Sequence, residues 1–289
     1  MPIAASNGID VYYEIGGDPA GDPLLLVMGL GAQLTAWPEP FVDDLAGRGF
    51  RVIRPDNRDS GLSTSLDGVP ANLFEAMADP AQAPYLLADM ATDLVGVLDH
   101  LGIDAAHVVG VSMGGMIAQT IALDHRTRVR SLCSIMSMTG APDVGQPTSE
   151  AMTALLTPPP QDRDGVLDRS VEMAAIIGSR THPPDPDETR LRAGAAYDRA
   201  HRPEGGARQL TAILASGDRT DRLRRLRVPT LVIHGLQDTL IQPDGGRATA
   251  AAIRRAELIE LADMGHDLPA HLWTRIADAI EKNARRADG

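Results

Sequence analysis

A serine lies between two glycines in the stretch Gly110-Val111-Ser112-Met113-Gly114. The apolar run HVVGV precedes this serine, and the helix-like run MIAQTIAL follows it. A serine at such a sharp strand-to-helix turn projects its hydroxyl clear of the sheet, where it can act as a nucleophile. Gly110 and Gly114 leave the room that the strand and the helix need to approach each other. The pattern therefore indicates nucleophilic chemistry at Ser112.

The serine needs two partners, because a hydroxyl is a weak nucleophile unless an imidazole accepts its proton and a carboxylate orients that imidazole. In one arrangement the chain order is serine, acid, histidine, and the acid and the histidine each follow a strand. Asp238 follows the apolar run VPTLVIHG, and His266 follows the run AELIELA. We therefore predict Ser112, Asp238 and His266 as the catalytic residues. Three other loop aspartates are expected to cap turns: Asp244, Asp263 and Asp267.

The chain contains eight histidines, and those other than His266 have ordinary explanations. His107 and His234 lie in or beside strand-like runs, where packing or a backbone hydrogen bond is expected. His100 and His125 lie near helix ends, where a positive imidazole interacts favourably with the helix dipole. The remaining three fall in a helical insertion or at the start of the final helix: His182, His201 and His271.

Negative charge that develops on a substrate oxygen needs hydrogen-bond donors near the nucleophile. The N–H of Met113 opens the helix that follows the serine and faces the same space. The run PLLLVMGLGAQ turns at Met28-Gly29, which places the N–H of Leu30 toward the serine. We therefore predict Leu30 and Met113 as backbone donors of an oxyanion hole. For Leu30 the alternative is a glycine-rich turn without a ligand role.

The elements that must position these residues are short apolar runs separated by helix-like stretches. We expect strands at residues 9–15, 23–29, 50–56, 106–112, 129–137, 229–235 and 256–262. Helical spacing of apolar residues predicts one helix at 89–101 and a closing helix at 273–284. Near-continuous apolar strands separated by helices indicate a mostly parallel sheet covered on both faces. The predicted fold class is therefore α/β.

The alternation breaks once, in a region that carries the proline-rich stretches TPPPQ and HPPDP. Helix-like pieces occur there at 166–177, 188–199 and 206–215, without a strand-like run. The region is too long for an ordinary crossover connection. We predict that residues 141–227 form a helical cap over the carboxyl edge of the sheet, while residues 1–140 and 228–289 form the core.

Five stretches together resemble the α/β-hydrolase superfamily, in particular actinobacterial carboxylesterases of the lipase/esterase G kind and aclacinomycin methyl esterases. They are VMGLGAQLTAW, RVIRPDNRDSGLST, HVVGVSMGGMIAQ, PTLVIHGLQDTL and DMGHDLP. The resemblance covers residues 9–140 and 228–285, and it is loose in the cap. Met28-Gly29 replaces the His-Gly of many members, and Asp59 stands where many have glycine, which leaves that loop's conformation open. The serine at position 112 excludes the dehalogenases and epoxide hydrolases of this fold, which use aspartate.

The resemblance implies ester hydrolysis through an acyl-enzyme, with a small to medium hydrophobic ester as the substrate. Trp37, Ile177 and Tyr197 are candidate walls of an apolar substrate pocket without a charged clamp, and core packing is the alternative for each. Other serine chemistries of the fold stay open: hydrolysis of lactones, thioesters, amides or carbon–carbon bonds, perhydrolysis, and methyl ester removal in antibiotic tailoring. A non-catalytic ligand receptor is the alternative from a different class, although no catalytic position is degraded.

The composition narrows the partners. The formal net charge of −12 argues against nucleic acid or an anionic membrane as a partner. The longest apolar runs are far shorter than a membrane span, and no signal peptide is predicted. Cys133 is the only cysteine, which fits a reducing compartment, so a cytoplasmic protein is expected. The motifs of metal and dinucleotide sites do not occur, so we predict no metal and no organic cofactor. The oligomeric state is not predicted.

Overall fold

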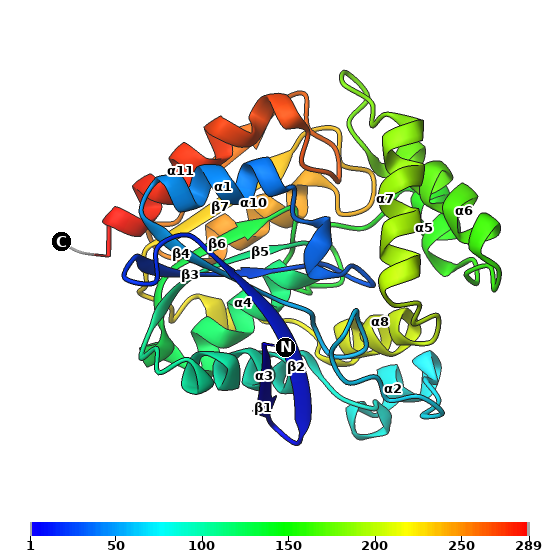
Figure 1. Ribbon diagram of the computed structural model, residues 1–289, viewed down its shortest axis with the longest axis horizontal. Helices are drawn as coiled ribbons and strands as arrows, with labels where there is room; N and C mark the ends of the chain where they lie inside the picture. The colour runs from blue at the N-terminus through cyan, green and yellow to red at the C-terminus, as the bar shows by residue number, and fades with distance from the viewer. Residues whose placement is uncertain (1, 288–289) are drawn as a thin grey trace.

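An eight-stranded sheet runs through the centre of the molecule (Figure 1), in the order β1-β2-β4-β3-β5-β6-β7-β8. The computed structural model describes residues 2–287, so position 1 and positions 288–289 of the predicted core lie outside the described residues. The strands are β1 (Ile3–Ser6), β2 (Ile9–Gly16), β3 (Asp22–Val27), β4 (Phe50–Pro55), β5 (Ala106–Val111), β6 (Val129–Ile135), β7 (Thr230–Gly235) and β8 (Glu257–Leu261). All neighbours from β4 to β8 are parallel, whereas β1 and β2 pair antiparallel at one edge. The predicted α/β class with a mostly parallel sheet is confirmed.

Strand β5 lies between β3 and β6, and all of its residues are buried. A strand covered on both faces must be apolar almost throughout, which explains the sequence AHVVGV. His107 is the polar exception, and its Nδ1 lies 2.8 Å from the Oγ of Ser131 on β6. Because the carboxyl ends of parallel strands meet at one edge, the segments that follow β3, β5, β7 and β8 come together there.

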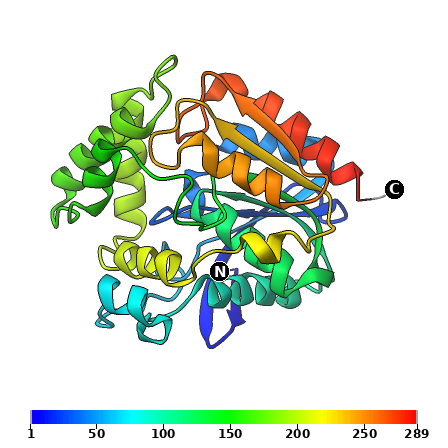
Figure 2. The ribbon, with the colours of Figure 1, turned by 180° about the vertical axis from the view of Figure 1, so that it is seen from behind.

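Helices cover both faces of the sheet (Figures 1 and 2). Helices α1 (Glu39–Gly47) and α11 (Trp273–Arg285) pack against each other on one face, and α3 (Leu87–His100), α4 (Met113–Asp124) and α10 (Pro243–Ala252) cover the other. Shorter helices occur in the connections: η1 (Leu34–Ala36), α2 (Leu73–Ala78), η2 (Pro80–Gln82), η3 (Arg126–Arg128) and η4 (Ala270–Leu272). None of the helices in residues 2–287 combines the length and the apolar character that crossing a bilayer requires.

The connection from β6 to β7 consists of helices, with no strand among its described residues. They are α5 (Ser149–Leu156), α6 (Arg163–Ile177), α7 (Pro186–Arg199), α8 (Gly205–Ala215) and α9 (Thr220–Leu223). Helix α6 begins after Asp162, whose side chain accepts a hydrogen bond from the N–H of Gly165, and α7 begins after Asp185 in the same way. Three of these helices match the expected pieces within a few residues, whereas α5 was not expected. In Figure 1, α5, α6 and α7 stand together beyond one end of the sheet.

Candidate active site

The turn from β5 to α4 holds Ser112 in a backbone conformation that side chains rarely adopt, with φ 55° and ψ −123°. Glycines on either side make this turn feasible. A Cβ on Gly110 would lie 2.0 Å from the carbonyl oxygen of Gly114, and a Cβ on Gly114 would lie 2.1 Å from that of Val27. The strand and the helix therefore approach so closely that only glycine fits at either position.

Three side chains from separate loops meet at this turn. The Oγ of Ser112 lies 2.9 Å from Nε2 of His266, and Nδ1 of the same imidazole lies 2.7 Å from Oδ2 of Asp238. A carboxylate can only accept, so Nδ1–H donates to Asp238 and leaves Nε2 free to accept from the serine hydroxyl. The structure thus brings together the three residues that were expected to act as one unit.

The environment of Asp238 keeps it ionised. Its Oδ1 accepts hydrogen bonds of 2.9 Å from the N–H groups of Leu240 and Ile241, and Nε2 of His234 lies 3.5 Å from Oδ2. Burial raises the pKa of Asp238, but the charge of His266 and hydrogen bonds from His234 and His266 outweigh burial and lower the pKa to about 2. His234 also lies 2.8 Å from the carbonyl oxygen of Ile241 through the same Nε2, so it is the packed, backbone-bonded histidine that its strand position predicted.

Helix α6 holds the loops that carry the histidine and the acid. The N–H of His266 donates to the carbonyl oxygen of Ile177 at 2.7 Å, and Oγ1 of Thr239 donates to that of Ile176 at 2.9 Å. These are the last two residues of α6, and carbonyls at a helix end have no partner within their own helix. The insertion therefore fixes part of the candidate site directly.

The loop after β3 lies against the serine. A Cβ on Gly29 would lie 3.2 Å from the Cβ of Ser112 and 3.7 Å from its Oγ. The next residue is Leu30, one of the two expected oxyanion donors. Within residues 2–287, neither the N–H of Leu30 nor that of Met113 donates a hydrogen bond. Both groups remain available to an acceptor beside Ser112.

Three buried polar side chains hold this loop in place, and the sequence did not identify them as site residues. Asn57 donates from Nδ2 to the carbonyl oxygen of Met28 at 2.9 Å, and Asp56 accepts from the N–H of Leu34 at 2.7 Å. Gln209 of α8 accepts from the N–H of Gly31 at 2.7 Å. The stretch RPDN contained the only sequence signal for the first two, and nothing in the sequence pointed to the glutamine.

A cavity of about 800 Å³ lies among α5, α6, α7 and α8 and reaches Leu30 and His266. Ile177 lines it, as expected of a pocket wall. The other two candidates lie elsewhere. Trp37 is 1% exposed in the core and stacks on Phe41, with ring centroids 6.0 Å apart. Tyr197 does not line the cavity, and its ring packs at 32° against that of His201, with centroids 4.3 Å apart. Trp37 is displaced because the chain turns into η1 just before it, which directs its ring beneath α1.

The wall of the cavity is mostly apolar, with Leu155, Met173 and Leu210 among its members. It also includes two arginines, Arg169 and Arg192, which the sequence interpretation of an uncharged pocket did not anticipate. Arg169 already has partners within the protein. Its Nη1 lies 3.3 Å from Oε2 of Glu172, and its Nη2 donates to the carbonyl oxygen of Ala154. The wall also contains Asp267, so charges of both signs border the cavity.

Comparison with known proteins agrees with this architecture. The sequence profile described as the alpha/beta hydrolase fold matches residues 22–269. The chain belongs to the alpha/beta hydrolase family. Rhodomycin D methylesterase DnrP of Streptomyces peucetius is 32% identical to it, over 99% of this chain and 98% of the relative. 2-Hydroxymuconate semialdehyde hydrolase of Pseudomonas sp. strain CF600 is 31% identical, over 90% of this chain and 83% of the relative. A thermophilic esterase from Thermogutta terrifontis superposes with a TM-score of 0.71 at 26% identity, with 99% of this chain and 97% of that chain covered.

The family match confirms the predicted superfamily. The two methylesterase relatives confirm that the chain resembles methyl esterases of this kind. The protein is a hydrolase, as its esterase and hydrolase relatives indicate. In this alpha/beta hydrolase the position that differs from many members, Asp59, has φ 65°. That value is in the region that glycine favours, so the loop keeps a glycine-type conformation despite the aspartate.

Proposed function

We propose that this alpha/beta hydrolase is a serine carboxylic-ester hydrolase that works through Ser112, His266 and Asp238. The observation that carries the proposal is the pair of contacts of the imidazole, 2.9 Å to the serine and 2.7 Å to the carboxylate. In the first step Oγ forms a bond to the ester carbonyl carbon, while its proton passes to Nε2 of His266. Asp238 holds the imidazole in the required tautomer and stabilises its positive form.

The tetrahedral intermediate then collapses. The N–H groups of Leu30 and Met113 hold its oxyanion, and the loss of one such donor costs roughly 3 kcal/mol of transition-state stabilisation. The carbon–oxygen bond to the alcohol breaks, and His266 gives its proton to the departing oxygen. A water that His266 activates next attacks the acyl-enzyme, which releases the acid and restores Ser112.

The substrate that the cavity favours is a hydrophobic ester. Its walls are mostly apolar, and helices α5 to α8 of the insertion, residues 141–227, act as the cap that encloses it. A cavity of about 800 Å³ is larger than a short acyl chain needs. The relative DnrP is a rhodomycin D methylesterase. These two observations favour, as the second candidate, removal of a methyl group from the ester of a bulky, multi-ring acid, and we infer a cytoplasmic location for either activity.

The first experiment separates a serine esterase from the other hypotheses. Purified protein is tested with p-nitrophenyl esters of graded acyl length and with a fluorophosphonate probe, alongside Ser112→Ala and a surface control, Ser149→Ala. We expect turnover and single-site labelling in the wild type and in the control, and a loss of roughly 10⁶-fold in the Ser112 variant. Absence of both labelling and turnover in the wild type would overturn the proposal and favour a ligand receptor.

The second experiment addresses the substrate. Methyl esters of naphthoic and anthracenecarboxylic acids are compared with p-nitrophenyl acetate, with methanol release as the measurement. Ala207 lines the cavity, so a tryptophan at this position would occupy part of its volume. Ala207→Trp should therefore reduce the rate of hydrolysis of the bulky methyl esters at least tenfold more than that of the acetate. A protein that labels but cleaves no ester would instead be tested with lactones, thioesters and the dienol ketones that carbon–carbon hydrolases cleave.

A further inference from the structure

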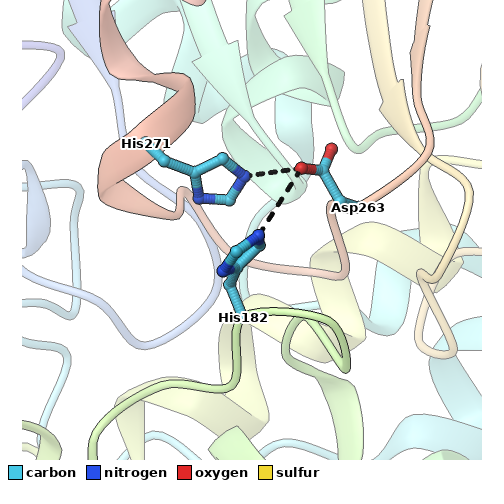
Figure 3. Close-up of side chains that lie close together, drawn as sticks. All are labelled: His182, Asp263 and His271. Atoms are coloured by element: carbon cyan, nitrogen blue, oxygen red, sulfur yellow. Dashed lines mark hydrogen bonds and ion pairs between the residues drawn. The ribbon is translucent and has the colours of Figure 1, made fainter.

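Two histidines and an aspartate gather at the junction of the insertion and the core, apart from the serine, aspartate and histidine described above (Figure 3). His182 comes from the connection between α6 and α7, Asp263 follows β8, and His271 lies in η4. Nε2 of His271 lies 2.7 Å from Oδ2 of Asp263, and Nε2 of His182 lies 4.0 Å from the same oxygen. One ligand atom from each residue falls within 4.8 Å of the others.

An ordinary hydrogen bond explains only part of this cluster. The contact of His271 with Asp263 is such a bond, and it is the largest cause of the lowered pKa of Asp263, to which the charges of both histidines also contribute. It does not account for His182, whose ring lies 4.0 Å from that of His271 at 47° and whose Nε2 turns toward the same oxygen. Among the described residues His182 has no hydrogen bond, so its nitrogen lone pair is not committed elsewhere. Two imidazoles directed at one carboxylate oxygen bring three potential metal ligands, from three segments of the chain, within reach of a single cation.

The donor set fits one class of cation. Imidazole nitrogen and carboxylate oxygen are ligands that Zn²⁺ and its neighbours in the transition series prefer, with bonds of about 2.0–2.1 Å. Tetrahedral geometry at that bond length places ligand atoms about 3.3 Å apart. The distances from Oδ2 of Asp263 to Nε2 of His271 and of His182, 2.7 and 4.0 Å, are respectively shorter and longer than this value. The side chains of His182, Asp263 and His271 are 54%, 32% and 35% exposed, so rotation alone can close the difference.

We propose that His182, Asp263 and His271 bind one divalent transition-metal ion of the zinc class, with water completing the coordination. Nε2 of His271 gives up its proton, which passes to Nδ1 or to solvent, and Nε2 of each histidine binds the metal as a neutral imidazole. The ion joins a loop of the insertion to two segments of the core. A metal that binds only the folded protein stabilises it by an amount that grows with the logarithm of the metal concentration once that concentration exceeds the dissociation constant.

The ion would reinforce contacts that the same loops already make. Ser179 accepts from the N–H of Gly265 at 2.9 Å and donates to Asp267 at 2.5 Å. Gln237 accepts from the N–H of Arg180 at 2.6 Å. These bonds attach residues 179–180 to the two neighbours of His266 and to the residue before Asp238. A metal bound through His182 and Asp263 would add coordination bonds between the same two loops, close to these hydrogen bonds.

The experiment measures metal binding without any substrate. Untagged full-length protein is stripped with a chelator and titrated calorimetrically with ZnCl₂, alongside His182→Ala, His271→Ala and Asp263→Asn. His201→Ala is the matched control, because His201 is another histidine of the insertion that lies outside the cluster. We expect one ion per chain in the wild type and the control, and at least tenfold weaker binding in each of the three variants.

Thermal unfolding provides the second readout. Zn²⁺ should raise the melting temperature of the wild type and of His201→Ala, and leave that of His182→Ala unchanged. Mg²⁺ should have no effect, because it prefers oxygen ligands in an octahedral arrangement. Equal zinc affinity in the wild type and the three variants would overturn the proposal, as would failure of the wild type to bind Zn²⁺ at millimolar concentration. Circular dichroism of the metal-free variants shows whether each one is folded before titration.

Discussion

Asp59 and Arg208 form a two-pronged ion pair that joins the loop after β4 to helix α8. Nη2 of Arg208 lies 2.8 Å from Oδ1 of Asp59, and its Nε donates to Oδ2 at 2.9 Å. The two side chains are 1% and 0% exposed. Burial raises the pKa of Asp59, but hydrogen bonds from Arg208, Tyr85 and the N–H of Leu66 outweigh burial and lower it. The residue that replaces the usual glycine therefore anchors the insertion to the core.

Arg208→Ala should be strongly destabilising, because it leaves the Asp59 carboxylate buried and without its cation. We expect a loss of about 3–5 kcal/mol in the free energy of unfolding, measured by denaturant titration. Arg163→Ala, which removes an exposed ion pair with Asp198, should leave the free energy of unfolding nearly unchanged. The double variant Asp59→Asn/Arg208→Leu should recover part of the loss, because an asparagine carries no charge, can still form hydrogen bonds with Tyr85 and the N–H of Leu66, and tolerates φ 65°. A double variant no more stable than Arg208→Ala would contradict this account.

Asp238→Asn should reverse the tautomer of His266. The asparagine oxygen can still accept from the N–H groups of Leu240 and Ile241, which turns its amide N–H toward Nδ1. Nδ1 then accepts, Nε2 carries the proton, and the serine loses its base. We expect kcat to fall roughly 10⁴-fold while the fold is retained. Steady-state kinetics and circular dichroism of the variant check both parts, and near-normal kcat would refute the assigned role.

Asp238→Asn should also make the free energy of unfolding less dependent on pH under acidic conditions. Because the pKa of Asp238 is lowered to about 2 in the folded protein, its ionised form contributes stability that is fully present above the unfolded pKa of about 3.9. That contribution is lost as the pH falls through about 2. The free energy of unfolding of the wild type should therefore drop more steeply than that of Asp238→Asn between about pH 4 and pH 2. Parallel curves over this interval would show that the carboxylate is not held in its ionised form.

Glycines at the serine turn should tolerate a methyl group unequally. Gly110→Ala places a Cβ 2.0 Å from a backbone oxygen, so we expect little soluble protein. Gly29→Ala meets Ser112 at 3.2 Å, a contact that a small shift of the loop relieves. Such a shift moves the N–H of Leu30, and kcat should fall roughly 10²-fold with folding intact. Gly47→Ala, with no atom within 4 Å of the added carbon, is the control and should leave both yield and kcat unchanged.

Cys133 should be unreactive in the native protein. It is buried in β6, and burial raises the pKa of its thiol. A thiol that stays protonated and out of reach of solvent does not attack a disulfide reagent. We expect Ellman's reagent to modify the protein only after denaturant unfolds it, with one thiol per chain. Fast reaction in the folded state would mean that the sheet opens at this strand.

The positions of seven strands along the chain and the residues that follow them were predictable from the sequence, because buried parallel strands are apolar runs and loops after them carry polar residues, whereas the order of the strands in the sheet was not predicted. Strand β1 was missed because IAAS is short and lacks a strong alternating pattern. Trp37 was assigned to the cavity because it follows the loop beside the serine, but the turn of η1 directs it into the core. No local pattern shows the direction of a side chain after a turn.

Contacts between distant segments were beyond the reach of the sequence for a different reason. Gln209 holds the loop of Gly31, and His182 lies beside Asp263, only because the helices between β6 and β7 pack against loops at one end of the sheet. Neither pair has a spacing that a motif could show. Asp263 was expected to cap a turn, whereas its carboxylate contacts the imidazole of His271 in η4. Such pairs become visible only when the position of the insertion is known.

The two carbonyls at the end of α6 have a consequence for the timing of the reaction. They accept hydrogen bonds from Thr239 and from the backbone N–H of His266. The same two bonds therefore join α6, which forms part of the cavity wall, to the loop that carries Asp238 and to the loop that carries His266, the proposed proton acceptor. A swing of α6 wide enough to admit a bulky ester would break these bonds and remove the contacts that position the loops of His266 and Asp238. Substrate loading and bond cleavage would then be exclusive in time. An enzyme with α6 displaced would therefore be inactive until the helix returns to its place.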